Sequence, residues 1–432
     1  MPKTVAFYTL GCKVNQYDSQ AMLEQFLLAG YESRPFNAPA DVYVVVTCVV
    51  TAAGEQKSRQ MLHRAKRLNE DAELVAAGCL AQKDAEKLKD LGARLILGSQ
   101  HRKQVVELLH RAMAEDTQIV AVADIRGIPY ENLRVSRQEG RTRAVIKIQE
   151  GCDRFCAYCI IPHVRGNIRS RPPELIREEA ERLAQAGYLE IVLTGIHLSS
   201  YGRDLDDTSL LDAVRMAAAP GINRVRLGSL EPVIATEQFV RGLTDVPALC
   251  PQFHLSLQSG SDTVLKRMRR RYTAREYLLA ARRLQAAFSR CALTTDVLVG
   301  FPGETEAEFL ETMDLCREVG FAKIHIFPFS LRKGTPAYDM PGQISPAEKD
   351  SRARRMSALA KELSRAYREP FLRSKQDVLF EKKGKDGLAF GHTPQYMEVR
   401  AVGGIPGHIQ KVRLQSLRGE GFEGTVITEP QV

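Results

Sequence analysis

The chain has 432 residues, of which 44% are hydrophobic and 26% are charged, an ordinary composition for a folded protein of two or three domains. Lys and Arg number 61 against 52 Asp and Glu, a net charge of +9. This composition excludes disordered, collagen-like and coiled-coil proteins. The longest apolar runs, such as Val42–Val50, are too short to span a membrane, and no signal-peptide pattern follows Met1, so we expect a cytoplasmic protein with no membrane partner.

Residues 1–125 alternate between strand and helix patterns. Strands are predicted over Thr4–Leu10, Val42–Thr47, Leu74–Ala77 and Arg94–Leu97, with helical stretches between them, the last of these near Gln82 to Asp90. Such alternation is typical of a parallel sheet with helices on its faces. The sequence therefore predicts an N-terminal α/β domain.

Three cysteines, Cys12, Cys48 and Cys79, each come just after one of these strands, and Gly11 and Gly78 precede two of them. The carboxyl ends of parallel strands meet at one edge of a sheet, which is where such folds bind ligands. We therefore expect the three thiols to share a metal site. The alternative is three unrelated thiols. Nine cysteines in an intracellular chain favour metal binding or catalysis over disulfides.

Residues 126–142 are polar with no apolar period and are interpreted as a linker. Residues 143–345 again alternate between strands and helices. Six repeats over this length predict a partial (βα)6 barrel, with a site at the carboxyl ends of the strands. The predicted strands are Ala144–Ile148, Ile191–Thr194, Arg224–Leu227, His254–Leu257, Thr295–Val299 and Lys323–Phe327.

Residues 346–368 are predicted to form one basic connecting helix, and residues 369–432 change to short strands with Gly-rich turns. This last pattern favours a small all-β barrel of the kind that often binds oligonucleotides. The alternative is a β cap that only stabilises the barrel domain. The predicted strands are Gln376–Glu381, Gly387–His392, Met397–Val402, His408–Leu417 and Gly424–Thr428.

The run Cys152-Asp-Arg-Phe-Cys156-Ala-Tyr-Cys159 directly follows a predicted strand. A structural zinc site takes four closed ligands, and no fourth cysteine is near, although His163 could serve. Cubane iron–sulfur clusters usually take four cysteines, so three would leave one iron open to a substrate or cofactor. Phe155 and Tyr158 would shield such a cluster from water, and Tyr158 is the candidate contact for a cofactor ring.

At these residues the chain resembles the methylthiotransferases of the radical S-adenosylmethionine (SAM) enzymes, and the resemblance covers nearly its whole length. The C-terminal part is similar to the RNA-binding TRAM barrel. The motifs that carry the resemblance are Thr9-Leu-Gly-Cys12-Lys-Val-Asn15, Gly78-Cys79-Leu-Ala-Gln82, Lys147-Ile-Gln-Glu-Gly-Cys152, Arg169-Ser-Arg-Pro172, Leu227-Gly-Ser-Leu-Glu-Pro232, His254-Leu-Ser-Leu-Gln-Ser-Gly260 and Thr295-Asp-Val-Leu-Val-Gly-Phe-Pro-Gly-Glu304.

The resemblance implies two 4Fe-4S clusters and S-adenosylmethionine as cofactors. One cluster would cleave S-adenosylmethionine to a radical that removes hydrogen from an unactivated carbon, and the other would supply the sulfur of a methylthio group. An electron donor, which the sequence does not identify, is also implied. The implied ligands are Cys152, Cys156 and Cys159 for the first cluster and Cys12, Cys48 and Cys79 for the second.

The sequence around Cys12 distinguishes the substrate groups of this family. Gly-Cys12-Lys-Val-Asn-Gln-Tyr-Asp18 is like the group acting on threonylcarbamoyladenosine in tRNA, whereas the isopentenyladenosine group usually reads Gly-Cys-Gln-Met-Asn and the ribosomal-protein group Gly-Cys-Pro-Lys-Asn. Val46 and Gly54 depart from the usual pattern without touching a ligand. The implied reaction is methylthiolation of C2 of this nucleoside at position 37, in the anticodon loop. The other two substrates, and a non-catalytic zinc-containing RNA-binding protein, are the alternatives.

Gly195 and Gln258 directly follow predicted strands and Asp296 lies in the next one, and all three are candidate cofactor contacts, with loop ordering as the alternative. Residues 266–290 hold nine basic residues and one acid, which suits RNA phosphates as well as a solvated helix face. Arg165 and Arg169 could neutralise a cofactor carboxylate or a phosphate. The candidate RNA-binding residues are Arg267, Arg269, Arg270, Arg271 and Tyr396.

Overall fold

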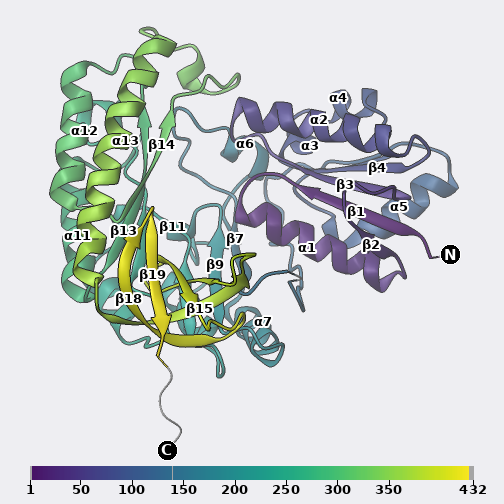
Figure 1. Ribbon diagram of the computed structural model, residues 1–432. Helices are drawn as coiled ribbons and strands as arrows, with labels where there is room; N and C mark the ends of the chain where they lie inside the picture. The colour runs from purple at the N-terminus through teal and green to yellow at the C-terminus, as the bar shows by residue number, and fades with distance from the viewer. Residues whose placement is uncertain (1, 139, 428–432) are drawn as a thin grey trace, which may run out of the picture.

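The first sheet contains six parallel strands in the order β2-β1-β3-β4-β5-β6. It belongs to a computed structural model that describes residues 2–138 and 140–427. Every residue of β3 is buried, because the sheet is covered on both faces (Figure 1). The strands are β1 (Thr4–Thr9), β2 (Glu32–Arg34), β3 (Val42–Thr47), β4 (Glu73–Gly78), β5 (Leu95–Leu97) and β6 (Ile119–Ala121).

Side chains of β3 alternate between the two faces of this sheet. Tyr43 and Val45 join the core under α2, α3 and α4, whereas Val44 and Val46 join the core under α1 and α5. The predicted helix over 82–90 is in fact two short helices that break at Asp84. The helices are α1 (Lys13–Leu28), α2 (Ala52–Leu68), α3 (Cys79–Lys83), α4 (Ala85–Asp90), η1 (Arg102–Gln104) and α5 (Val105–Ala114).

The middle of the chain forms two four-stranded sheets, β10-β9-β7-β8 and β11-β12-β13-β14. A backbone bridge between Val225 and Leu249 links them, so six parallel strands curve into a partial barrel. This arrangement confirms the predicted (βα)6 fold class. The strands are β7 (Ala144–Glu150), β8 (Arg169–Ser170), β9 (Glu190–Gly195), β10 (Arg224–Leu227), β11 (Ser229–Leu230), β12 (Gln252–Leu255), β13 (Ala292–Val299) and β14 (Lys323–Pro328).

Helices cover the outside of the partial barrel, and their starts show why they begin where they do. The hydroxyl groups of Thr273 and Thr305 each accept a hydrogen bond from the backbone N–H three residues later, and the threonine backbone N–H donates to the Glu carboxylate at that position, the capping-box pattern. The helices are α6 (Ile161–Arg165), α7 (Pro173–Gln185), η2 (Leu198–Ser200), α8 (Leu210–Ala217), η3 (Pro232–Ile234), α9 (Glu237–Thr244), α10 (Asp262–Arg267), α11 (Ala274–Ala287), α12 (Glu306–Val319), η4 (Pro336–Tyr338), α13 (Pro346–Arg368) and η5 (Glu369–Phe371).

The C-terminal part is a closed five-stranded barrel in the order β15-β16-β17-β19-β18, as the fold class predicted. It packs on the partial barrel (Figure 1), where Arg224 and Arg226 of β10 donate to backbone oxygens at His392 and Pro394. The end of the predicted strand 424–428 lies outside the described residues. The strands are β15 (Lys375–Lys383), β16 (Ala389–His392), β17 (Glu398–Val402), β18 (Ile409–Arg418) and β19 (Gly421–Val426).

Among the described residues, none of the helices combines the length and the apolar character that crossing a membrane requires.

Candidate active site

The N-terminal cysteines lie at one edge of the first sheet. Cys12 precedes α1, Cys48 follows β3, and Cys79 begins α3. Gly11 and Gly78 both have a φ of 98°, which favours glycine. A Cβ at Gly11 would come within 3.0 Å of Cys48 Sγ, and one at Gly78 within 2.9 Å of a backbone oxygen of β3. The glycines therefore let the cysteine loops approach one another.

Asn15 holds these loops together. Its side-chain amide donates to the carbonyl oxygens of Leu10 (2.7 Å), which follows β1, and Thr47 (2.9 Å), which ends β3. Its side-chain oxygen accepts a hydrogen bond from Arg165, the last residue of α6. Arg165 Nε in turn donates to Cys79 Sγ at 3.1 Å. A residue that closely follows the second cysteine motif therefore contacts the first cysteine triad.

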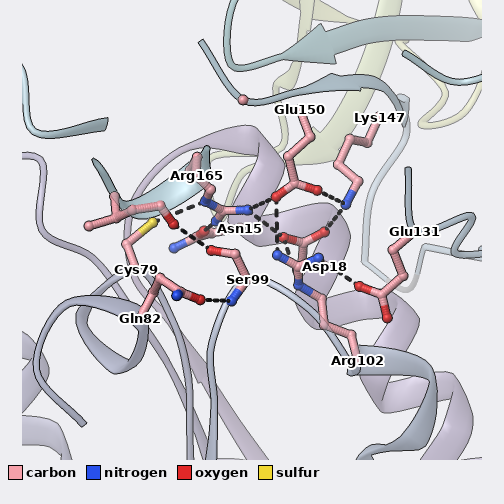
Figure 2. Close-up of polar contacts among 12 residues, drawn as sticks. Asn15, Asp18, Cys79, Gln82, Ser99, Arg102, Glu131, Lys147, Glu150 and Arg165 are labelled. Atoms are coloured by element: carbon pink, nitrogen blue, oxygen red, sulfur yellow. Dashed lines mark hydrogen bonds and ion pairs between the residues drawn. The ribbon is translucent and has the colours of Figure 1, made fainter. Parts of the chain in front are cut away.

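Arg165 belongs to a buried group of charges, the closed network of Asp18, Arg102, Lys147, Glu150 and Arg165 (Figure 2). Lys147 Nζ lies 2.5 Å from Asp18 and 3.2 Å from Glu150. Arg102 lies 3.2 Å from Asp18 and 3.1 Å from Glu150, and Arg165 pairs with both carboxylates. Burial alone would raise the pKa of Glu150, but the surrounding cations hold it well below its usual range.

Thiol protonation at the first triad follows from burial and from Arg165. Burial raises the pKa of Cys12 and Cys48, while the Arg165 guanidinium acts in the opposite direction at both. Metal binding requires the thiolate form. Arg165 therefore favours the state of these cysteines that can hold a metal centre.

The second triad, Cys152, Cys156 and Cys159, lies on the loop after β7. Gly151 has a φ of 77°, and a Cβ there would overlap the carbonyl oxygen of a neighbouring loop at 1.7 Å, so only glycine fits. Burial, and then the neighbouring thiols, raise the pKa of Cys152 to about 11 and of Cys159 to about 12. Arg270 Nη1 donates to Cys156 Sγ at 3.3 Å.

Each triad offers three thiols, and the type and position of the neighbouring side chains indicate which metal centre the thiols could bind. Within residues 2–138 and 140–427, no three His, Cys, Asp or Glu side chains are close enough together for a single metal ion. His163 is exposed, with its ring against Phe155 at 5.5 Å. Both donor sets consist of thiols alone, which is the ligand chemistry of iron–sulfur clusters, whereas a four-ligand zinc site on the second triad would need the exposed His163 as its fourth ligand.

Five residues were candidate cofactor contacts, and four of them lie on the loop after β7 or at the ends of β9 and β12. Asp296 instead lies within β13, where its carboxylate is 3.2 Å from His254 Nε2. Phe155 is 48% exposed, and Tyr158 packs edge-on against Phe301. A Cβ at Gly195 would lie 2.8 Å from the Gln149 side chain. Gln258 adopts a φ of 68° and its backbone N–H donates to the carbonyl oxygen of Asp296. These assignments stay predictions.

Glu231 gathers three basic side chains beside the second triad. Its carboxylate lies 2.8 Å from Arg154, 3.1 Å from His197 and 3.1 Å from Arg270. Burial would raise its pKa, but the His197 hydrogen bond and these charges lower the pKa of Glu231 to about 2. Sequence reasoning missed Arg154 and His197. The available signals were the place of Arg154 between two motif cysteines and of His197 just after a strand end.

The basic run after α10 divides by environment. Arg267 pairs with Glu308 at 2.8 Å, whereas Arg269 and Arg271 are exposed. Arg270 has a side chain only 7% exposed and is engaged by Glu231 and Cys156, so it faces the cysteine loop and not a surface open to RNA. Arg165 is likewise fully buried, which leaves no access for a phosphate.

Comparisons with known proteins agree with this geometry. Residues 146–316 match the Radical SAM superfamily, and residues 4–98 match the Uncharacterized protein family UPF0004. The chain is 40% identical to the threonylcarbamoyladenosine tRNA methylthiotransferase MtaB of Bacillus subtilis (strain 168), over 95% of this chain and 93% of that protein. It is 37% identical to the MtaB of Thermotoga maritima, over 97% and 96%.

A second kind of relative is somewhat less similar. The tRNA-2-methylthio-N(6)-dimethylallyladenosine synthase of Parafrankia sp. is 36% identical over 89% of this chain and 79% of that protein. Among solved structures, the radical S-adenosylmethionine methyltransferase TsrM from Kitasatospora setae shares the fold, with a TM-score of 0.56 and 15% identity over 78% of this chain and 74% of that chain. The chain therefore belongs to the family of threonylcarbamoyladenosine tRNA methylthiotransferases within the radical SAM superfamily.

Proposed function

We propose that this chain adds a methylthio group to C2 of N6-threonylcarbamoyladenosine at position 37 of tRNA. The names of its relatives from Bacillus subtilis and Thermotoga maritima support this substrate. The observation that carries the proposal is the contact between Arg165, which closely follows the second cysteine triad, and Cys79 of the first. Two thiol triads that are joined in this way suit one reaction that needs both.

Membership of the radical SAM superfamily implies one 4Fe-4S cluster and S-adenosylmethionine. We infer a second cluster on Cys12, Cys48 and Cys79, in addition to the first on the CxxxCxxC cysteines. When bound, these groups supply the one-electron chemistry that an unactivated C–H bond requires.

The protein's own part is orientation and exclusion of water. Tyr158 and Phe301 form an apolar wall beside the second triad. Glu231 holds Arg154, His197 and Arg270 in fixed positions around it. A site so enclosed keeps reactive species away from solvent and close to their target.

The tRNA contacts remain predictions. Arg269 and Arg271 are exposed and can reach phosphates, which would position the anticodon loop without reading its sequence. The closed C-terminal barrel suits RNA binding. An electron donor, not identified by the sequence or the fold, is required as a further partner.

Mass spectrometry of nucleosides from total tRNA tests the proposal. Cells that lack the gene should lose the methylthio form of threonylcarbamoyladenosine and accumulate the unthiolated base, and the restored gene should reverse both changes. Restoration with Cys156→Ala is the matched control and should not rescue. Loss of the isopentenyl form instead would move the chain to the other nucleoside, and no change in any nucleoside would favour a ribosomal protein or a binding role.

Iron analysis of anaerobically purified protein tests the second cluster. Two clusters predict about eight iron atoms per chain, with about four in Cys79→Ala and about four in Cys156→Ala. Zinc in place of iron, in a colourless protein, would support the non-catalytic alternative.

A further inference from the structure

A hollow of about 270 Å³ lies where the three parts of the chain meet. The N-terminal domain contributes Lys13, the partial barrel contributes Arg226, His254 and His325, and the C-terminal barrel contributes Tyr396. Lys13, Arg226 and Tyr396 also line a second, adjoining hollow of the same volume. Ligand sites commonly form at such junctions between domains. We call the two together the open hollow.

Lys13 is the first residue of α1 and directly follows Cys12. Its side chain is exposed, and within the described parts of the chain its ammonium makes no hydrogen bond or ion pair. Lys13 thus lines the open hollow as a cation without an ion-pair partner in the described chain, since Glu190, whose charge acts on it, is already paired with Arg224 and Arg226.

Arg226 supplies a second incomplete cation. Its Nε binds Glu190 at 3.0 Å, and its Nη1 binds Gln252 and the carbonyl oxygen of Pro394. Its Nη2 is buried and has no hydrogen-bond partner among the described residues. Arg226 is itself only 3% exposed. A buried, unsatisfied guanidinium N–H group is costly unless a ligand completes it.

The acidic residues of the open hollow are mostly engaged elsewhere. Glu381 accepts from His392 and pairs with Arg143, and Glu420 pairs with Lys323 at 3.0 Å. Glu398 also lines the hollow. The place for an added anion is therefore next to Lys13 and Arg226, on the side that adjoins Cys12.

Resting on the proposed function, we propose that Lys13 and Arg226 bind the free carboxylate of the threonyl group on the substrate base. Threonylcarbamoyladenosine carries this carboxylate, whereas isopentenyladenosine carries an uncharged group at the same nitrogen. The cations of Lys13 and Arg226 can pair with the carboxylate of threonylcarbamoyladenosine, but they would stay unpaired beside isopentenyladenosine. The two residues therefore favour the first nucleoside as the substrate. A tRNA phosphate presents similar anionic chemistry, and the experiment below separates the two sources.

The test measures binding of three anticodon stem-loops by the cluster-containing enzyme. The loops are identical except at position 37, which carries threonylcarbamoyladenosine, its neutral methyl ester, or adenosine. The wild-type enzyme should bind the acid about tenfold more tightly than the ester, the equivalent of one good charge pair. Lys13→Gln should bind acid and ester equally and bind the adenosine loop as the wild type does.

Lys323→Gln is the matched control, because Lys323 lines the same hollow but is already paired with Glu420. This variant should keep the tenfold preference. Melting temperature and iron content should match the wild type in both variants, since Lys13 is exposed and unpaired.

Two results overturn the inference. If Lys13→Gln weakens all three loops equally and lowers the salt dependence of binding, Lys13 contacts a phosphate. If the wild type binds acid and ester alike, no carboxylate is recognised. Failure of the proposed function looks different, because the wild type would then form no methylthio product on the threonylcarbamoyladenosine loop at all.

Discussion

Helix α1 connects two groups of cations that differ in what neutralises them. Asp18, one turn and a half along the helix, lies in the closed network, where Arg102, Lys147 and Arg165 are matched by buried carboxylates. Lys13, at the start of the same helix, faces the open hollow, where no described residue pairs with it. The two regions are five residues apart in sequence and have opposite electrostatic character.

The charges of the closed network stabilise the fold, whereas those of the open hollow are available to bind a ligand. In the closed network the attraction of a nearby carboxylate offsets the cost of burying each cation. Removing one cation therefore leaves a buried negative charge without its partner. In the open hollow, Lys13 has no ion-pair partner among the described residues, and the positive charges of Arg143 and Arg226 act on it more strongly than the negative charge of Glu190. Such an arrangement disfavours the empty fold and favours binding of an anion.

Removing a cation from the closed network should have the largest effect. Arg165→Leu is expected to lower the free energy of unfolding by about 3–5 kcal/mol, because Glu150 and Asp18 lose a buried partner. Urea unfolding of the cluster-free protein measures this change. Arg111→Leu, on the exposed side of α5, is the control and should change it by less than about 0.5 kcal/mol. Equal effects of the two variants would mean that the network adds nothing to stability.

A smaller effect is expected at the cysteines themselves, where Arg165 and Arg270 each donate to one sulfur. Arg165→Lys should lower the reduction potential of the N-terminal cluster by about 40 mV, the equivalent of about 1 kcal/mol for one electron, since a hydrogen bond to sulfur stabilises the reduced state. Potentiometric titration followed by electron paramagnetic resonance measures it.

The control for this titration is the other cluster in the same protein. Its potential should stay unchanged in Arg165→Lys and should fall in Arg270→Lys. A shift of both clusters in either variant would show a general loosening of the site and not the loss of one hydrogen bond.

Much of this arrangement was predictable where it depends on local pattern. Cys48 follows the β-branched run Val44–Thr47, and Cys79 follows an apolar run that ends in Gly78, so these strand ends could be read from the sequence. The break at Asp84 within a predicted helix was missed, because a continuous apolar period extends across it.

Contacts between domains could not be predicted in the same way. Arg165 and Asp18 are 147 residues apart, and no periodicity indicates that they meet. The sequence of residues 266–290 showed that this segment is basic, but not which side chains point outward. Arg269 has a φ of 59°, and the turn at this residue directs Arg270 inward to Cys156, while Arg269 and Arg271 stay exposed. Position 13 did distinguish substrate groups, but only the assembled hollow gives that lysine a physical role.

The basic segment of residues 266–290 includes an exposed arginine, Arg269, and a paired arginine, Arg267. Comparing the two gives a further, smaller test of the difference between free and neutralised cations. Arg269→Gln should weaken tRNA binding about threefold and reduce the slope of log affinity against log salt by about 1, as loss of one phosphate contact does. Arg267→Gln should have little effect, because Glu308 already neutralises Arg267. Binding isotherms at several salt concentrations measure both, and equal effects would place the RNA over Glu308 as well.

The smallest change in stability is expected for Lys13, which contrasts most directly with Arg165. Lys13→Gln should change the free energy of unfolding by less than about 0.5 kcal/mol, or raise it slightly, because the variant removes an unpaired cation and its repulsion from Arg143 and Arg226. Urea unfolding under the conditions used for Arg165→Leu measures this change. A loss of more than about 1 kcal/mol would show that Lys13 supports the fold, and the open hollow would then differ from the closed network in degree only. A neutral result, together with lost preference for the carboxylate, would mean that its charge is kept for binding alone.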